Sequence, residues 1–198
     1  MAGRPRAFDR ETALEDAMRA FWAHGYERTG LPELQAAMGI GRQSLYNAFG
    51  DKRALFLEAL DHYGTTQFRW LHERLAAPGS GLANVRAVLA TWVDAVTARD
   101  FRGCLVCNAT VEFGRDREVT AITERHNAAI EASFLAALRR AQAAGELRPS
   151  TDVAALAQFL ATLGQGLALQ GRGGLSRAKA AAIVGVADGL LDAAAAGR

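Results

Sequence analysis

Residues 25–53, GYERTGLPELQAAMGIGRQSLYNAFGDKR, form the most informative part of the sequence. The spacing of Leu34 and Met38 predicts a short helix over 31–38 with one buried face. A turn containing two glycines follows, and a second short helix is predicted over 42–49. Two short helices joined by such a turn indicate a helix-turn-helix, in which the second helix enters the major groove of DNA.

The predicted helix over 42–49 is polar on the side opposite Leu45. Its outward residues suit DNA, because Gln and Asn can bond an adenine edge bidentately, Arg a guanine edge, and Tyr a phosphate. These side chains are Arg42, Gln43, Tyr46 and Asn47. The alternative is an ordinary solvated helix face.

The run Leu45-Tyr-Asn-Ala-Phe-Gly-Asp-Lys52 resembles the most characteristic signature of the TetR family of bacterial transcriptional regulators. The resemblance extends nearly unbroken from about Glu11 to Leu60. It implies base-proximal roles for Arg42 and Gln43. The full set of DNA contacts that we expect is Arg4, Arg6, Thr29, Arg42, Gln43, Ser44, Tyr46, Asn47 and Lys52.

Three members of this set have narrower grounds. Arg4 and Arg6 resemble the basic arms that enter the minor groove beside a helix-turn-helix, although a tail with incidental charge remains the alternative. Thr29, like Tyr46 and Lys52, matches a family position that contacts phosphate. The chain departs from the family at Gly41, where a capping Ser or Thr is usual, and this costs only about a few tenths of a kcal/mol.

Composition excludes several other classes. Of the 198 residues, 50% are hydrophobic, yet no stretch approaches 18 uninterrupted apolar residues, so we expect no membrane span. The N-terminus lacks the apolar segment of a signal peptide, and the two cysteines indicate a reducing cytoplasm. The net charge of +2 is modest, so the placement of charge rather than its total favours DNA.

The rest of the chain also predicts helices, which gives an all-α fold. Apolar periodicity places these helices at about 10–23, 51–76, 82–99, 103–113, 116–144, 151–171 and 175–195. The family resemblance implies a DNA-binding domain over 1–50 and an effector-binding and dimerisation domain over 51–198, joined by the helix that starts near Asp51.

The resemblance further implies that the last two helices pair with a second subunit as a four-helix interface. Both helices carry apolar stripes with small residues between them. The residues that we expect in this interface are Leu156, Leu160, Leu163, Leu167, Ile183, Ala187, Leu190 and Leu191.

The second informative stretch is GCLVCNATVE, residues 103–112. On a helix, Cys104, Asn108 and Glu112 share one face, and a position near the helix start lowers the pKa of a thiol. The pattern resembles a TetR branch that responds to electrophiles and unsaturated compounds, from which Cys107 departs. Two inert buried cysteines are the alternative. Zinc is disfavoured because no further ligands have the required spacing.

A cavity for an effector is expected in the larger domain. Its candidate lining residues are Trp92, Cys104, Cys107, Asn108, Glu112, His126 and Phe134. His126 lies in an apolar helix stripe, so a hydrogen-bonded core histidine is the alternative for it. Aromatic residues at helical spacing are ordinarily core residues, which is the alternative for Trp92 and Phe134.

These observations together predict a homodimeric, ligand-responsive repressor that binds an inverted-repeat operator in double-stranded DNA. The expected partners are DNA, a second copy of the chain and an unidentified small molecule, with no cofactor and no metal. A constitutive DNA-binding protein remains open. An all-helical enzyme with Cys104 as nucleophile and His126 as base also remains, but neither an orienting group nor an oxyanion site is evident for it.

Overall fold

The computed structural model describes residues 8–196. Within this range the structure is all-α, as predicted, and contains no β-strand beyond a bridge between Leu147 and Ala195. The helices are α1 (Arg10–His24), α2 (Leu31–Met38), α3 (Arg42–Phe49), α4 (Lys52–Gln67), α5 (Arg69–Ala76), α6 (Gly81–Val96), α7 (Leu105–Phe113), α8 (Arg117–Ala143), α9 (Val153–Arg172) and α10 (Arg177–Ala194).

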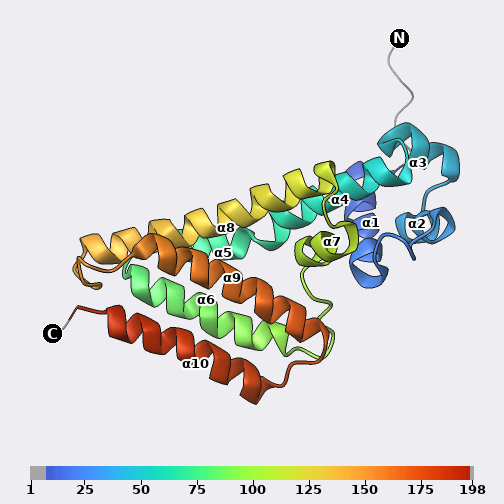
Figure 1. The fold of residues 1–198 in the computed structure, drawn as a ribbon. Coiled ribbons are helices and arrows are strands. Elements are labelled where there is room, and N and C mark those ends of the chain that lie inside the picture. Colours follow the sequence, from blue (N-terminus) through green and yellow to red (C-terminus); the bar gives the residue numbers. More distant parts are fainter. Residues whose placement is uncertain (1–7, 197–198) are drawn as a thin grey trace, which may run out of the picture.

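The molecule is elongated, with α1, α2 and α3 forming a head at one end (Figure 1). Helix α4 leads out of the head, and the long helix α8 runs beside it toward the other end. Helices α5, α6, α8, α9 and α10 form a bundle, in which α6 packs against α8, α9 and α10. The short helix α7 lies between the head and the bundle.

Helix ends in the head follow from local chemistry. The Asp9 carboxylate accepts from the Thr12 N–H at 2.7 Å and caps α1, and Asp51 caps α4 in the same way. Helix α2 ends at Gly39, whose φ of 64° lies in the left-handed region that favours glycine. Gly41 precedes α3 without a side-chain cap, as its sequence requires.

One predicted helix is wrong in its extent. The segment 51–76 was expected as a single helix, but α4 ends at Gln67 and α5 begins at Arg69. At the joint, the N–H groups of Leu71 and His72 both bond to the Phe68 carbonyl, at 3.0 and 3.1 Å. The Phe68 ring packs edge-on against Tyr63 and His126. Tertiary packing therefore sets this break, with no proline or glycine at residue 68 to announce it.

The described residues form two hydrophobic cores. One lies in the bundle and includes Leu89, Phe134 and Leu160. The other lies in the head, but it also takes in α4, α7 and the start of α8 through residues such as Leu60 and Val106. The head core is thus completed by helices that follow residue 50, and the proposed boundary at that residue stays a prediction.

Candidate DNA interface and ligand cavity

Helix α3 presents a polar face to solvent at the end of the head. Arg42, Gln43, Tyr46 and Asn47 are all exposed, whereas Leu45 is fully buried. The Gln43 amide donates to the Asn47 side-chain oxygen at 3.0 Å, and the Arg42 guanidinium lies 5.6 Å from the Tyr46 ring centroid. These four side chains form a continuous donor and acceptor surface of the kind that reads base edges.

The remaining predicted DNA contacts have different environments. Lys52 is half-buried, and its ammonium lies 4.1 Å from the Tyr26 ring centroid. Ser44 is half-buried in the first turn of α3. Arg4 and Arg6 lie outside the described residues.

Thr29, which matches a phosphate-contacting position of the family, does not present its side chain to solvent. Thr29 is fully buried, and its hydroxyl donates to the Gly25 carbonyl at 2.6 Å. The hydroxyl closes the turn before α2 because the turn folds back on the end of α1. The side chain therefore supports the head from within.

Ion pairs fix α4 to the helices around it. Arg10 on α1 donates to Glu58 at 2.5 and 2.7 Å, and Arg53 donates to Asp116 and Glu118 at 2.7 Å. Asp116 also caps α8, and hydrogen bonds from the Val119 N–H and from Arg53 lower the pKa of its carboxyl. The start of α4 is therefore tied to both the head and α8.

Helix α7 touches the head at both of its ends. At its C-terminal end the Glu112 carboxylate accepts from the backbone N–H groups of Tyr26 and Glu27, at 3.2 and 3.0 Å. The Phe113 ring packs against Tyr26 at 5.2 Å between centroids. At the other end, the Trp22 indole donates to the Gly103 carbonyl at 2.9 Å. A displacement of α7 would therefore also move the loop that joins α1 to α2.

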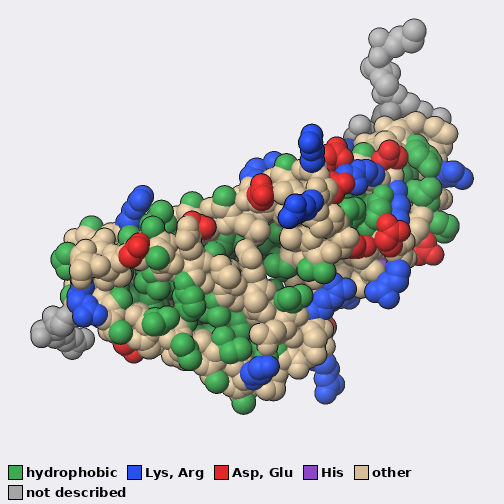
Figure 2. All heavy atoms as spheres, in the orientation of Figure 1, with side chains coloured by type: hydrophobic (Ala, Val, Ile, Leu, Met, Phe, Trp, Pro, Cys, Tyr) green, Lys and Arg blue, Asp and Glu red, His purple; other side chains and the backbone are tan. Residues whose placement is uncertain are grey.

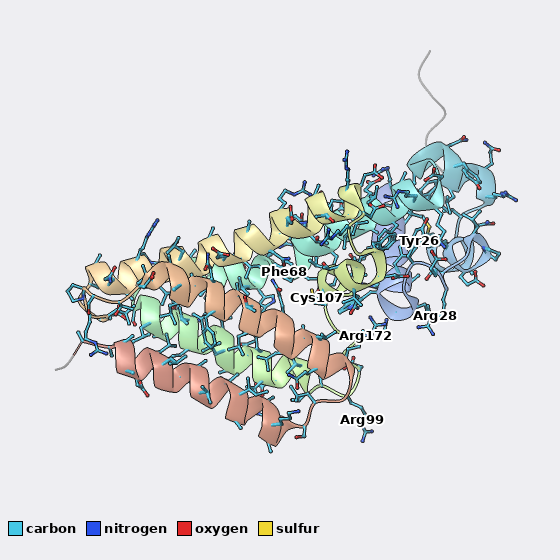
Figure 3. The ribbon with its side chains drawn as sticks, viewed as in Figure 1. Tyr26, Arg28, Phe68, Arg99, Cys107 and Arg172 are labelled. Atoms are coloured by element: carbon cyan, nitrogen blue, oxygen red, sulfur yellow. The ribbon has the colours of Figure 1, made fainter. Side chains whose placement is uncertain are left out.

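A cavity of about 290 Å³ lies where α7, the α4–α5 joint and the bundle meet. Figure 3 shows Phe68 and Cys107 in this middle part of the molecule. The lining residues are Trp22, Tyr63, Gln67, Phe68, Trp70, Leu71, Trp92, Ala95, Val96, Phe101, Gly103, Cys104, Cys107, Asn127, Ile130, Ala161, Gly164, Gln165 and Ala168.

Two thiols and a phenol form a small network in the cavity wall. Both cysteines are half-buried free thiols. The hydrogen bond with Cys107 lowers the pKa of Cys104, and the same contact together with burial raises the pKa of Cys107. Burial raises the pKa of Tyr63 well above its ordinary value. Cys104 is therefore the member of this network that most readily becomes an anion.

Three of the seven predicted cavity residues line it: Trp92, Cys104 and Cys107. Helix α7 begins at Leu105, so Cys104 occupies its N-cap, and no residue of α7 beyond Cys107 lines the cavity. Asn108 donates to the Arg102 carbonyl at 3.3 Å and lies, with Glu112, beside a separate surface groove. The placement of Asn108 and Glu112 in the cavity was wrong.

Two further cavity assignments were also wrong, for reasons of packing. The ring of His126 is buried and contacts Asp61 at 2.8 Å, so it is a hydrogen-bonded core histidine. Phe134 is fully buried behind the cavity wall, where its ring meets Trp92 at 5.6 Å between centroids.

Most of the residues that line the cavity were not predicted from the sequence. Trp22 and Tyr63 were not among the expected lining residues, and the α4–α5 joint that brings Gln67 and Phe68 to the cavity was not predicted. One signal was present, because all three tryptophans of the chain line this cavity. Among residues 8–196, no group of three or more His, Cys, Asp or Glu is arranged to hold a metal ion.

The predicted dimer residues divide into two groups. Leu160, Leu167, Ala187 and Leu191 are buried in the core of their own subunit, so their assignment to an interface was wrong. Leu156, Leu163 and Ile183 are half-buried, and Leu190 is 46% exposed. The exposed large apolar side chains on α9 and α10 are Leu190, which was predicted, and Phe159, Leu169 and Val186, which were not.

This exposed surface is unusually apolar. An 18-residue window of α9 has a mean hydropathy of 1.3, although only 22% of it is buried. Figure 2 shows many hydrophobic groups over the bundle, where charged side chains are scattered, and a denser group of charged side chains toward the head. Helices with apolar surface of this extent ordinarily pack against another protein surface.

Known proteins resemble the chain over almost its whole length. Residues 13–59 match the family "Bacterial regulatory proteins, tetR family", and residues 81–183 match "Tetracyclin repressor-like, C-terminal domain". The HTH-type transcriptional repressor ComR of Escherichia coli is 35% identical over 190 residues, covering 92% of this chain and 89% of ComR. The uncharacterized HTH-type transcriptional regulator YezE of Bacillus subtilis is 37% identical over 161 residues, covering 80% of this chain and 83% of YezE.

Solved structures agree with this assignment. A cysteine mutant of the TetR family transcriptional regulator CifR, complexed with a 26 bp double-strand operator DNA, matches with a TM-score of 0.83 and 38% identity. The match covers 97% of this chain and all of the CifR chain. These relatives are transcriptional regulators, so the enzyme alternative is set aside. The chain belongs to the TetR family of bacterial transcriptional regulators.

Proposed function

We propose that the chain is a repressor that binds an inverted-repeat operator as a homodimer and leaves it when a small molecule enters the cavity. The observation that carries this proposal is the exposed polar face of α3, with Gln43 and Arg42 free to meet base edges. A second support is the CifR relative, which was solved on double-strand operator DNA. A role on DNA places the protein in the cytoplasm.

The dimer is proposed from the exposed apolar surface of α9 and α10. Two such helices from each subunit form a four-helix interface, with Phe159, Leu169, Val186 and Leu190 as its apolar side chains. Two-fold symmetry would then present two α3 helices to two half-sites.

Release by a ligand is proposed from the position of the cavity. Its wall includes Phe68 at the α4–α5 joint and Cys104 at the start of α7. Helix α4 packs against α1, and α7 is bonded to the head through Glu112. A ligand that fits only one arrangement of these helices would shift the population toward that arrangement. Shifting the balance 100-fold requires about 2.7 kcal/mol of difference in ligand affinity between the two states.

Modification of Cys104 is a second candidate route to release. It is favoured by the half-buried thiol, its lowered pKa and its place in the cavity wall. It is also favoured by the resemblance of residues 103–112 to the branch that responds to electrophiles. Two inert thiols and a purely non-covalent ligand remain the alternative.

The test of the proposed function is a gel-shift titration against the DNA upstream of the protein's own gene. We expect a single specific complex with the stoichiometry of one dimer per inverted repeat. Equal affinity for this DNA and for a scrambled duplex would contradict the proposal.

A further inference from the structure

The chemistry of the cavity wall restricts what can bind there. Six of its residues carry aromatic rings: Trp22, Tyr63, Phe68, Trp70, Trp92 and Phe101. These rings come from four separate segments, namely α1, the α4–α5 region, α6 and the loop before α7. A flat ring system entering the cavity would meet ring faces and edges on several sides, an arrangement that aromatic pairs prefer.

The cavity wall also lacks formal charge. Among the described residues that line it there is no Asp, Glu, Lys, Arg or His. The phenol of Tyr63 stays neutral because burial raises its pKa, and the thiol of Cys107 stays neutral because its hydrogen bond with Cys104, together with burial, raises its pKa. Cys104 is the one lining group whose pKa is lowered, chiefly by its hydrogen bond with Cys107, and its sulfur offers no positive charge to pair with an anion. A charged ligand would therefore lose its hydration without gaining a partner of opposite charge.

Polar recognition in the cavity falls to three carboxamides. Gln67, Asn127 and Gln165 line it, and no hydrogen bond within the described part of the chain engages their side chains. Each carboxamide offers two donor hydrogens and an acceptor oxygen. A ligand group that both donates and accepts, such as an amide or a hydroxyl, would satisfy them.

The volume sets the size of the ligand. About 290 Å³ corresponds to roughly ten water molecules at liquid density, and so to a ligand of about 10–15 non-hydrogen atoms. This is the size of a bicyclic aromatic compound with one polar substituent.

We infer that the effector of this regulator is an uncharged aromatic compound of that size, carrying one amide-like or hydroxyl-like group. The inference rests on the proposed function, because it assigns a ligand class to the same cavity. It sets this cavity apart from one that takes a carboxylate or an amine, since the described lining offers neither a cation nor a carboxylate to pair with them.

The probe pair that tests the inference is naphthalene-2-carboxamide and naphthalene-2-carboxylate, which have the same shape and number of non-hydrogen atoms. Calorimetry of the full-length protein at pH 7 needs no DNA. We expect the amide to bind with a Kd of about 0.1–1 mM and the carboxylate to bind at least about 10-fold more weakly. The cation naphthalen-2-ylmethanamine should also be disfavoured.

Two variants locate the binding site. Gln165→Leu should weaken binding of the amide about 10-fold because it removes a polar partner from the wall. Gln170→Leu, an exposed position of α9 outside the cavity lining, is the matched control and should bind like wild type. Circular dichroism checks that both variants are folded.

The outcomes separate this inference from the proposed function. Equal or tighter binding of the carboxylate or the amine, or no binding of the amide, would overturn the ligand class. Weaker binding in Gln170→Leu than in Gln165→Leu would also overturn the assignment to this cavity. Binding of the amide without any loss of operator affinity would support the ligand class and contradict release by a ligand.

Discussion

The carboxylate of Glu112 is the point where α7 holds the head, and its removal is the most informative perturbation of the fold. It accepts two backbone N–H groups, from Tyr26 and Glu27, at 3.2 and 3.0 Å. Gly25 lies so close that an added Cβ would be 3.2 Å from a Glu112 oxygen, which shows how tightly the loop folds over the carboxylate. Glu112→Ala leaves both N–H groups to water.

The expected loss of stability follows from the number of hydrogen bonds that Glu112 accepts and from their exposure to water. A hydrogen bond to a charged group is worth about 1.5–3 kcal/mol, but water competes at an exposed site such as Glu112, so the pair together should contribute about 1–2 kcal/mol. For a chain of this length, each kcal/mol corresponds to about 2–4 °C in Tm. We therefore expect Glu112→Ala to lower Tm by about 2–8 °C, and Glu112→Gln, which keeps a neutral acceptor, to lower it by less.

The assay is thermal unfolding followed by circular dichroism at a fixed protein concentration, because dimerisation makes Tm depend on concentration. Glu124→Ala is the matched control. Glu124 is an exposed residue of α8 with no side-chain hydrogen bond or ion pair within the described residues, so its removal should change stability by less than about 0.5 kcal/mol. If Glu112→Ala unfolds at the same temperature as Glu124→Ala, the carboxylate does not hold the head and the reasoning is refuted.

Four further predictions concern DNA, the dimer, the thiol and pH. Gln43→Ala should cost about 1–3 kcal/mol of operator-binding free energy and relax preference at one base pair, whereas Lys52→Ala should weaken binding to every duplex and reduce the salt slope by about one. Fluorescence anisotropy at several salt concentrations measures both effects. An unchanged operator affinity in Gln43→Ala would rule out its base contact. Leu190→Glu should give monomers in sedimentation, because it buries a charge in the proposed interface. The control Ala181→Glu, two and a half turns away on α10, should remain dimeric. A dimeric Leu190→Glu would argue against this surface as the interface. N-ethylmaleimide should release operator DNA from wild type but not from Cys104→Ser. In the wild type, the Cys104 thiolate adds to the alkene of the reagent and the adjacent carbon takes up a proton. Release from both proteins would show that Cys104 is not the target. The pKa of Asp116 is lower in the folded protein than in the unfolded chain, so its contribution to stability is complete above about pH 4 and is lost as pH falls through the folded pKa. Asp116→Asn should therefore flatten the acid limb of a curve of Tm against pH. An unchanged acid limb would contradict this prediction.

The helix-turn-helix was predictable because its determinants are local. The apolar spacing of Leu34 and Met38, the turn glycine Gly39 and the cap Asp51 each act within a few residues. The exposed face of α3 follows directly from the burial of Leu45 and Phe49. Local chemistry of this kind can be read from a sequence without knowing what packs against it.

The cavity was not predictable to the same degree because it is built from distant segments. Trp22 and Gly103 are joined by one hydrogen bond although 81 residues separate them. The break at Phe68 depends on Tyr63 and on His126, which belongs to α8. On α9, helical spacing identified an apolar stripe at Leu160 and Leu167, but it did not show that this stripe faces the core and that Phe159 and Leu169 face outward.

Binding of the purified protein to the DNA upstream of its own gene, with footprinting of the protected bases, tests the proposed repressor function. We expect one dimer to protect two inverted half-sites, at an affinity at least about 10³-fold above that for a scrambled duplex at physiological salt. We also expect Gln43→Ala to lower this preference by about 1–3 kcal/mol while keeping its affinity for scrambled DNA. Binding without sequence preference, or a footprint on a single unrepeated site by a monomer, would contradict the proposal that the protein binds an inverted-repeat operator as a homodimer.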